Sequence, residues 1–310
     1  MKTVSQNLMM AVFLLVTVLP LKAQKDIVMS QYMHNRYAIN TAFAGNREVL
    51  SLYGGFRKKW AGFEGAPSSM LFSMHSALKN ENVALGFDVY NQQYGVNKET
   101  GFSASYTYRL KLSGGQKLAF SVNAGGGFYS ANWSEVATLG NSGSLDPEFA
   151  ANESNFAPIV GFGSAWYANN FFMGFSVPNF FYYDPYVLGG ENSIALDKAN
   201  YLLTAGYLFE LSRKVHLQPS ALARINPEFG SFVDVNASLI YNNQLWIGAG
   251  YRTSNDMTAM VGYQVSPQFR FSYSFDYSTG EISSYSNGTH EVAIQFDFGY
   301  RVKTSSPKFF

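Results

Sequence analysis

The chain has 310 residues, of which 17% are aromatic and only 14% are charged, with a formal net charge of +1 and no cysteine. An average soluble domain carries roughly 25% charged residues, so this chain is poor in charge and rich in aromatic rings. The near-zero net charge gives no reason to expect nucleic acid as a partner. The absence of cysteine excludes disulfides, thiolate metal ligands, cysteine nucleophiles and lipid attachment at an N-terminal cysteine.

The N-terminus has the features of a secretory signal peptide. Lys2 provides a positive start, residues 8–19 form an apolar run, and residues 20–23 offer a cleavage region that ends at Ala23. The apolar run is shorter than the ~20 residues that a membrane-spanning helix needs. We therefore expect residues 1–23 to be a cleaved signal peptide, and no later segment is long and apolar enough to form a spanning helix.

From residue 48 onward the apolar residues repeat with a period of two. The clearest example covers residues 102–111, where Phe, Ala, Tyr, Tyr and Leu alternate with Ser, Ser, Thr, Arg and Lys. This pattern predicts β-strands with one apolar and one polar face. We predict about fourteen strands, near residues 48–57, 68–77, 82–92, 100–112, 116–130, 155–167, 170–180, 199–211, 214–225, 230–241, 244–252, 256–265, 268–278 and 289–302.

The links between these strands alternate in length. Short turns are expected near residues 79–81, 113–115, 168–169, 212–213, 242–243 and 266–267. Most links between them are longer, near residues 58–67, 93–99, 131–154, 181–198 and 279–288, while those near 226–228 and 253–255 are shorter. Short turns at one end and long loops at the other are typical of bacterial outer-membrane barrels. The fold class is therefore all-β, a transmembrane antiparallel barrel over residues 48–302 with both termini on the periplasmic side.

A soluble β-sandwich or propeller would also show alternating strands. Strands of about 9–13 residues, aromatic residues near the strand ends and no fixed propeller repeat favour the membrane barrel. In a barrel the charged strand face lines the lumen. That face carries Asp88, Arg109, His216, Arg224, Asp234, Arg252, Arg270, Asp276, Glu291 and Asp297. Pro219 falls within a strand, where it removes a ladder donor, and predicts a bulge.

Residues 24–47 precede the first strand. They show neither the period-two alternation of a strand nor the apolar stripe of a helix. A barrel of fourteen strands leaves a channel unless something fills it, so this segment is predicted to act as a plug. A loose periplasmic tail is the alternative. Residues 303–310 form a short C-terminal tail.

Two motifs lie in and directly after this segment. They are carried by Gln31, Tyr32, Met33, Asn35, Asn40, Ala44, Gly45, Arg57, Trp60, Gly62, Gly65, Ala66 and Pro67. The first is similar to Gln-Tyr-Met-x-Asn followed by Asn-Pro-Ala-Tyr-Ala-Gly, and the second to Arg-x-Gln-Trp-x-Gly-x-x-Gly-Ala-Pro. In both motifs the chain resembles the PorP/SprF family of type IX secretion outer-membrane proteins. The chain departs from the family at Thr41, Phe43 and Lys59, which replace Pro, Tyr and Gln.

The resemblance implies a barrel that serves secretion or surface display. Members of the family engage the C-terminal sorting domain of a large exported protein such as an adhesin. They also associate with secretion components and peptidoglycan-linked periplasmic proteins, in some cases in gliding motility. The implied partners are therefore these proteins together with outer-membrane lipid.

No residues in the sequence indicate an enzyme. The four histidines are scattered without metal-ligand spacing, and the glycine triplet at residues 125–127 falls inside a strand, where a phosphate-binding loop is not expected. We therefore expect no catalytic residues, no cofactor and no metal.

The two longest links contain apolar residues that are candidates for partner contact. They are Trp133, Phe149, Tyr182, Tyr183, Tyr186 and Leu188. Aromatic residues are enriched at protein interfaces, although packing on the barrel rim explains them equally well. The alternative function is a porin or fatty-acid-type channel for small or hydrophobic solutes.

Overall fold

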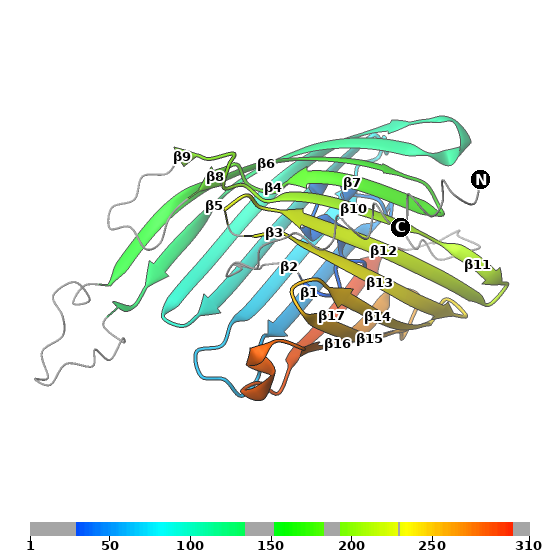
Figure 1. The fold of residues 1–310 in the computed structure, drawn as a ribbon. Coiled ribbons are helices and arrows are strands. Elements are labelled where there is room, and N and C mark those ends of the chain that lie inside the picture. The colour runs from blue at the N-terminus through cyan, green and yellow to red at the C-terminus, as the bar shows by residue number, and fades with distance from the viewer. Residues whose placement is uncertain (1–28, 134–151, 183–192, 229, 300–310) are drawn as a thin grey trace, which may run out of the picture.

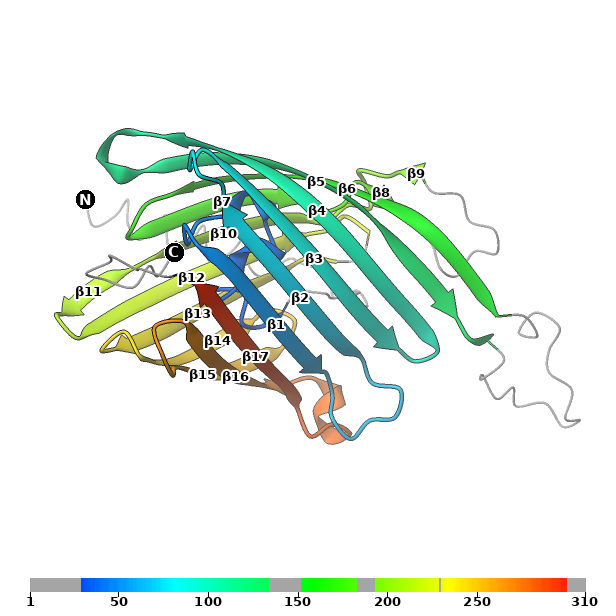
Figure 2. The same ribbon diagram turned by 180° about the vertical axis from the view of Figure 1, so that it is seen from behind.

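The computed structural model describes residues 29–133, 152–182, 193–228 and 230–299, which form one antiparallel β-barrel (Figures 1 and 2). Its wall strands are β1 (Leu50–Lys58), β2 (Ser68–Ala77), β3 (Val83–Tyr94), β4 (Asn97–Lys111), β5 (Lys117–Ala131), β6 (Glu153–Tyr167), β7 (Phe171–Val177), β10 (Tyr201–Tyr207), β11 (Phe209–Ser212), β12 (Val215–Ile225), β13 (Phe232–Tyr241), β14 (Leu245–Arg252), β15 (Asp256–Gln264), β16 (Phe269–Ser278) and β17 (Thr289–Phe298). Among the described residues, none of the helices has the length and apolar character to span a membrane.

The barrel closes by pairing of its first and last strands. β1 pairs with β17 over its whole length, from Leu50 opposite Phe298 to Lys58 opposite His290. β10 and β11 both pair with β12 and together take one place in the ring, so the barrel has 14 strands. The predicted fold class and strand count are confirmed, with boundaries displaced by a few residues.

The break between β10 and β11 lies beside Pro219. β10 pairs with β12 up to Gly206 opposite Ser220, and β11 resumes with Phe209 opposite Leu217. Pro219 lacks the N–H that would bond across this gap, so the missing donor coincides with the interruption in the neighbouring strand. The register shifts within β11, between Glu210 and Ser212. Pro219 itself pairs regularly with Ala237 of β13, so the bulge predicted at Pro219 is wrong, and the irregularity lies in the neighbouring strand.

The predicted long link at residues 93–99 is wrong. β3 and β4 continue to Tyr94 opposite Asn97, so only Gly95 and Val96 form the turn. Gly95 has a φ of +56°, as the first central position of a tight hairpin turn requires. The polar residues at the ends of these strands belong to the ladder, and therefore did not mark a loop.

The other links follow the predicted alternation and define two ends of the barrel. The short-turn end contains the turns after β2, β4, β6, β11, β13 and β15, including the 3₁₀ turn η3 (Ser113–Gly115). The long-loop end contains the remaining links, with the small sheet of β8 (Phe181–Tyr182) and β9 (Ser193–Ile194) and the 3₁₀ helix η6 (Glu281–Ser284). β1 begins and β17 ends at the short-turn end, as the even strand number requires.

The outer face of the wall is apolar and the lumenal face is polar. Tyr207, Tyr241, Tyr263 and Phe298 are exposed near the short-turn end, and Tyr251 and Tyr277 near the long-loop end, which is the arrangement of interfacial aromatic girdles. All ten charged or histidine residues predicted for the lumen lie on the inner face. Of these, Asp88, His216 and Asp297 are half-buried and the other seven are buried.

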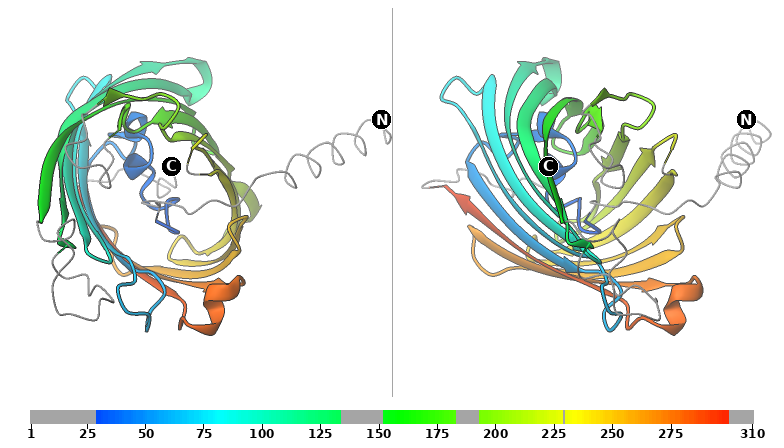
Figure 3. Two further views of the ribbon diagram at one scale, coloured as in Figure 1. Left: turned by 60° about the vertical axis from the view of Figure 1, so that its left-hand side comes forward. Right: turned by 90° about the vertical axis from the view of Figure 1, so that its left-hand side faces the viewer.

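Residues 29–47, called the lumenal segment below, lie inside the barrel. Figure 3 shows this dark blue stretch crossing the space enclosed by the strands. It contains two single-turn 3₁₀ helices, η1 (Arg36–Ala38) and η2 (Thr41–Phe43). The described part of the predicted plug therefore occupies the lumen.

Candidate functional site

The lumenal segment runs along the barrel axis. Ser30 lies beside Asp276 and Glu291, which are close to the long-loop ends of β16 and β17. Arg47 lies beside Asp297, close to the short-turn end of β17. The segment therefore descends from the long-loop end and joins β1 at the opposite end. The chain terminus itself lies outside the described residues, so its predicted periplasmic location stays a prediction.

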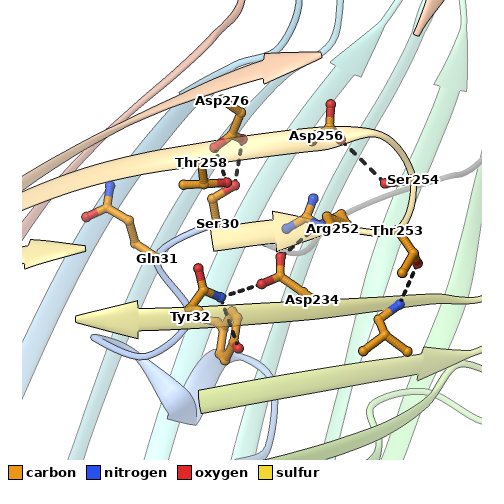
Figure 4. Close-up of polar contacts among 12 residues, drawn as sticks. Ser30, Gln31, Tyr32, Asp234, Arg252, Thr253, Ser254, Asp256, Thr258 and Asp276 are labelled. Carbon is orange, nitrogen blue, oxygen red and sulfur yellow. Dashed lines mark hydrogen bonds and ion pairs between the residues drawn. The ribbon is translucent and has the colours of Figure 1, made fainter. Parts of the chain in front are cut away.

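Two buried carboxylates hold the first residues of the segment, and Figure 4 shows one of them, Asp276, beside Ser30. Ser30 donates from its Oγ to Asp276 Oδ2 at 2.6 Å, and from its backbone N to Glu291 Oε2 at 2.8 Å. The backbone N of Gln31 donates to Glu291 Oε1 at 3.1 Å. Arg57 lies 2.9 Å from Asp276 and 3.8 Å from Glu291. Arg57 is the first residue of the second motif, so both motifs meet at this pair of carboxylates.

A second charge pair supports Tyr32 in the middle of the lumen. Asn236 donates from Nδ2 to the Tyr32 hydroxyl at 3.2 Å and also to Asp234. Asp234 in turn accepts from Arg252 Nε at 2.9 Å (Figure 4). Burial, and next the charge of Asp234, raise the pKa of Tyr32 above its ordinary value. The hydroxyl therefore stays protonated and neutral.

An apolar cluster joins the segment to the barrel wall. Its members are Tyr32, Met33, Ile39, Leu202, Leu222, Phe232 and Met260. Leu222 is fully buried although it shares the inner face of β12 with Arg224, Ser220 and Gln218. Burying an apolar side chain of this size contributes about 1.5–3 kcal/mol. The lumen is thus packed here as a protein core, and the barrel is not lined by polar groups alone.

Asn40 fixes the following turn to the wall. Its side-chain Oδ1 accepts from the backbone N of Ala42 at 3.0 Å, which caps η2, and its Nδ2 donates to the carbonyl oxygens of Ser164 and Phe175 at 2.9 and 3.2 Å. A Cβ at Gly163 would lie 2.3 Å from Asn40 Oδ1, and a Cβ at Gly174 would lie 2.8 Å from its Nδ2. The two glycines therefore create the space that the Asn40 amide fills.

The residue that follows shows how the chain tolerates Thr41 in place of the family's proline. The Thr41 hydroxyl lies 2.8 Å from Ser121 Oγ, and its carbonyl accepts from Thr107 Oγ1 at 2.9 Å. Asn40 still caps η2. Hydrogen bonds to the wall therefore maintain a turn that proline would otherwise preset.

Aromatic rings pack the segment between these points. The Tyr37 hydroxyl lies 3.0 Å from Ser105 Oγ, and its ring occupies the position that a Cβ at Gly86 would need. Arg36 lies over the ring of Phe172 at 4.5 Å, and Phe43 packs edge-on against the same ring. Asn35 donates to Ser73 Oγ at 3.1 Å.

The segment ends in a tight contact with β2, β3 and β4. Gly45 donates from its backbone N to His75 Nδ1 at 3.1 Å, and its carbonyl accepts from Arg109 at 2.6 Å. Gly45 has a φ of +67°, and a Cβ there would lie 2.7 Å from that of Ala84. Both its backbone conformation and its close approach to the wall therefore require glycine.

Positive charge collects at the short-turn end of the segment. His34 lies 3.5 Å from Arg270, and Arg47 forms an ion pair with Asp297 at 3.1 Å. Burial, and next the charges of Arg270, Arg47 and Arg36, hold the pKa of His34 well below its ordinary value. Burial and the neighbouring Arg47 lower the pKa of Arg36 to about 9. His34 is therefore neutral when the segment is in place.

The rest of the second motif forms a loop that is joined to the link between β16 and β17. The backbone N of Ala61 donates to the Gly288 carbonyl at 2.7 Å, and Asn287 N donates to the Ala61 carbonyl at 2.8 Å. Trp60 N donates to Thr289 Oγ1 at 3.2 Å. Trp60, Gly62 and Gly65 all have positive φ values, at +48°, +88° and +71°. The turns of this loop thus need its two glycines.

All thirteen motif residues lie in the lumen or in this loop. The seven from the first motif, Gln31, Tyr32, Met33, Asn35, Asn40, Ala44 and Gly45, are buried. In the second motif, Arg57 and Ala66 are buried, whereas Trp60 and Pro67 are half-buried and Gly62 and Gly65 are exposed. The first motif thus builds the segment that occupies the lumen, and the second builds the loop beside it.

The predicted partner-contact residues are only partly described. Trp133 is half-buried at the long-loop end, and Tyr182 is the last residue of β8 at the same end. Phe149, Tyr183, Tyr186 and Leu188 lie outside the described residues. In the described part of the chain no group of three or more metal-binding side chains comes together.

Sequence comparison identifies the family. Residues 21–296 match the family described as type IX secretion system membrane protein PorP/SprF. The chain belongs to the PorP/SprF family. No curated protein matches the sequence.

The solved structures that resemble this PorP/SprF protein are outer-membrane barrels and channels of low sequence identity. Omp33 of Acinetobacter baumannii is 9% identical with a TM-score of 0.47, over 81% of this chain and 100% of Omp33. A TodX deletion mutant, a monoaromatic hydrocarbon channel, is 11% identical with a TM-score of 0.47, over 85% and 94%. CymD, also a monoaromatic hydrocarbon channel, is 12% identical with a TM-score of 0.47, over 88% and 94%.

Family and fold together make this PorP/SprF protein a secretion-related outer-membrane barrel. Ser30, Arg36 and Leu222 contact the lumenal segment or belong to it but were not singled out from the sequence. Leu222 could have been found, because it is an apolar residue on a strand face that is otherwise polar. Nothing in the sequence marks Ser30 as a ligand of Asp276.

Proposed function

We propose that this chain is a type IX secretion component that binds the C-terminal sorting domain of an exported, adhesin-like protein. Binding takes place at the long-loop end and supports secretion or surface retention of that protein. The lumenal segment keeps the barrel closed during this process. The chain also associates with secretion components and peptidoglycan-linked periplasmic proteins, and its termini lie in the periplasm. It has no catalytic activity.

The observation that carries this proposal is the position of the family motifs. The first motif is used to fill the lumen, with contacts from Asp276 at one end to Asp297 at the other. A filled lumen is not that of an open diffusion pore, and a docking protein must not leak. The second motif is used in a loop at the long-loop end. Both uses fit a closed barrel that presents a surface to another protein.

Planar-bilayer conductance tests the closed state. The intact protein should pass little ionic current, and a variant that lacks residues 24–47 should open steadily. A matched control is Lys111→Gln, which alters an exposed ion pair on the wall and should leave conductance low. Steady current through the intact protein would instead favour a porin or fatty-acid-type channel.

Affinity purification from native outer membranes tests the partners. The tagged chain should recover a large exported protein together with secretion components. Removal of the C-terminal sorting domain from that protein should abolish its recovery. Recovery of neither class from gently solubilised membranes would contradict the secretion role.

A further inference from the structure

A cavity of about 250 Å³ lies in the lumen on the long-loop side of the lumenal segment. Its floor is formed by the segment itself, through Gln31, Tyr32, Ile39 and Asn40. Small-molecule pockets occupy roughly 300–1,000 Å³. The cavity therefore admits the end of a chain or a small molecule, but it excludes a folded domain.

One wall of the cavity is acidic and comes from β3 and β4. Asp88 and Glu99 line it, and both are held in place. Ser103 donates from Oγ to Asp88 at 3.1 Å, and the Tyr90 hydroxyl donates to Glu99 Oε1 at 2.8 Å. These carboxylates are thus oriented before any ligand arrives.

The opposite wall is basic. Lys198, from the link before β10, and Arg224, from β12, line the cavity there, and β12 lies across the ring from β3. Arg224 is buried, lies 4.8 Å from the centre of the Phe232 ring and donates to the Gly230 carbonyl at 3.4 Å. Lys198 is partly exposed and lies 3.8 Å from Glu228. The cavity therefore has a negative and a positive pole.

Between the poles the lining is amide-rich and aromatic. It includes Gln92, Asn123, Asn179, Asn200 and Asn226, with Tyr53, Tyr129 and Phe181. Each amide side chain offers a donor and an acceptor, as a peptide backbone requires of its partners. Asn123 and Asn226 also hold the rim, because they donate to the carbonyls of Pro178 and Lys198 at 3.1 and 3.0 Å.

We propose that this cavity binds the free C-terminus of a peptide chain, with the terminal carboxylate toward Arg224 and Lys198 and an upstream cationic side chain toward Asp88 and Glu99. This assignment rests on the proposed function, because the exported protein supplies the peptide. The lumenal segment forms the floor, so peptide binding and seating of the segment stabilise each other by thermodynamic linkage.

The test uses the full chain in lipid nanodiscs and two synthetic probes. They are N-acetyl-Lys-Ala-Ala-Leu with a free carboxylate and the same peptide with a C-terminal amide. Isothermal titration calorimetry should show at least tenfold tighter binding of the free acid. Arg224→Gln should reduce that preference to less than threefold, while Lys214→Gln, in an exposed turn at the other end, should leave it unchanged. Equal affinity for acid and amide in the unmodified protein overturns the proposal.

Two further variants keep the test independent of folding defects at Arg224. Glu99→Gln should reduce the advantage of the lysine-containing peptide over a norleucine analogue at least fivefold. Ala199→Phe, which fills the cavity without removing a charge, should weaken both peptides about tenfold, with heat-modifiable gel migration confirming a folded barrel. Sodium hexanoate binding as tightly as the peptide would overturn the peptide assignment in favour of a small carboxylate.

Capture from native membranes separates this proposal from the proposed function. If Arg224→Gln and Ala199→Phe recover as much exported protein as the unmodified chain, the cavity assignment is wrong and the secretion role stands. If the unmodified chain recovers none yet binds the free-acid peptide with the stated preference, the cavity assignment stands and the secretion role is wrong.

Discussion

The amide of Asn40 occupies the space that a side chain at Gly163 would need, since a Cβ there would lie 2.3 Å from Asn40 Oδ1. Asn40 belongs to the lumenal segment and Gly163 to the wall strand β6, so the shapes of the segment and the wall are complementary at this contact. The match explains how a polar side chain reaches the backbone carbonyls of a β-sheet: the wall has no side chain at that point.

Gly163→Ala should therefore displace the lumenal segment. Overpacking of this kind costs about 1–3 kcal/mol, which corresponds to a rise of roughly 5- to 150-fold in the population of displaced segment. The chain has no cysteine, so a cysteine introduced at Ala38 reports displacement through its rate of maleimide labelling. Gly54→Ala is the matched control, because its Cβ would meet only Ile294 at an ordinary 3.5 Å. Equal labelling rates in the two variants would show that Asn40 does not hold the segment.

Arg57→Gln should destabilise the protein strongly. The change leaves Asp276 and Glu291 buried without their cation, and breaking a buried ion pair costs about 3–5 kcal/mol. Urea unfolding in detergent should show this loss, together with faster labelling at Ala38→Cys. Lys111→Gln disrupts a pair whose side chains are 53% and 51% exposed, so its effect should be at most about 1 kcal/mol. A loss of similar size in both variants would contradict a special role for the buried pair.

Acid should loosen the lumenal segment through His34. In the seated segment the pKa of His34 lies well below 6.5, whereas a released, solvated histidine has a pKa of about 6.5. The released form therefore binds the proton more readily, and seating is fully favoured above pH 6.5 and weakens as the pH falls below it. At pH 5.5, protonation of the released His34 lowers the free energy that favours the seated segment by about 1.4 kcal/mol. The labelling rate at Ala38→Cys should therefore rise roughly tenfold.

His34→Gln should remove most of this acid response, because glutamine keeps an acceptor for Arg270 but does not titrate. His290→Gln is the control, since His290 bonds to Tyr273 on the outer face of the wall. A labelling rate that rises equally with acid in both variants would assign the response to other groups.

The barrel could be predicted because its signals are local. Alternation over residues such as Phe102 to Leu110 reports which face meets lipid, and the loop lengths report the two ends. The hairpin at Gly95 was missed because Gln92, Gln93 and Asn97 are polar, and polarity alone does not separate a loop from a strand that extends beyond the apolar zone. The interruption between β10 and β11 could be predicted only in part. Pro219 of β12 indicated an irregularity in this region, but the interruption lies in the neighbouring strand.

The site was predictable only as a list of motif residues. A contact such as Ser30 with Asp276 joins positions 246 apart in the sequence, and no local pattern encodes such a distance. The direction of the lumenal segment was equally hidden, because a plug can enter a barrel from either end. The matched glycines Gly163 and Gly174 look like ordinary strand glycines until Asn40 is placed against them.

Gly62→Ala should impair partner binding without destabilising the barrel. Gly62 has a φ of +88°, and a Cβ there would lie 2.8 Å from Asn287 Nδ2, so the substitution strains the contact between the second-motif loop and the link before β17. That contact lies at the exposed long-loop end and buries little apolar surface, so the urea midpoint should move only slightly. Capture of the exported protein from native membranes should fall at least threefold. Gly280→Ala is the matched control in the same loop pair, because its Cβ would meet nothing within 4 Å, and it should capture normally. Normal capture by Gly62→Ala as well would remove this loop from the docking surface and leave the links before β6 and β10 as the candidates.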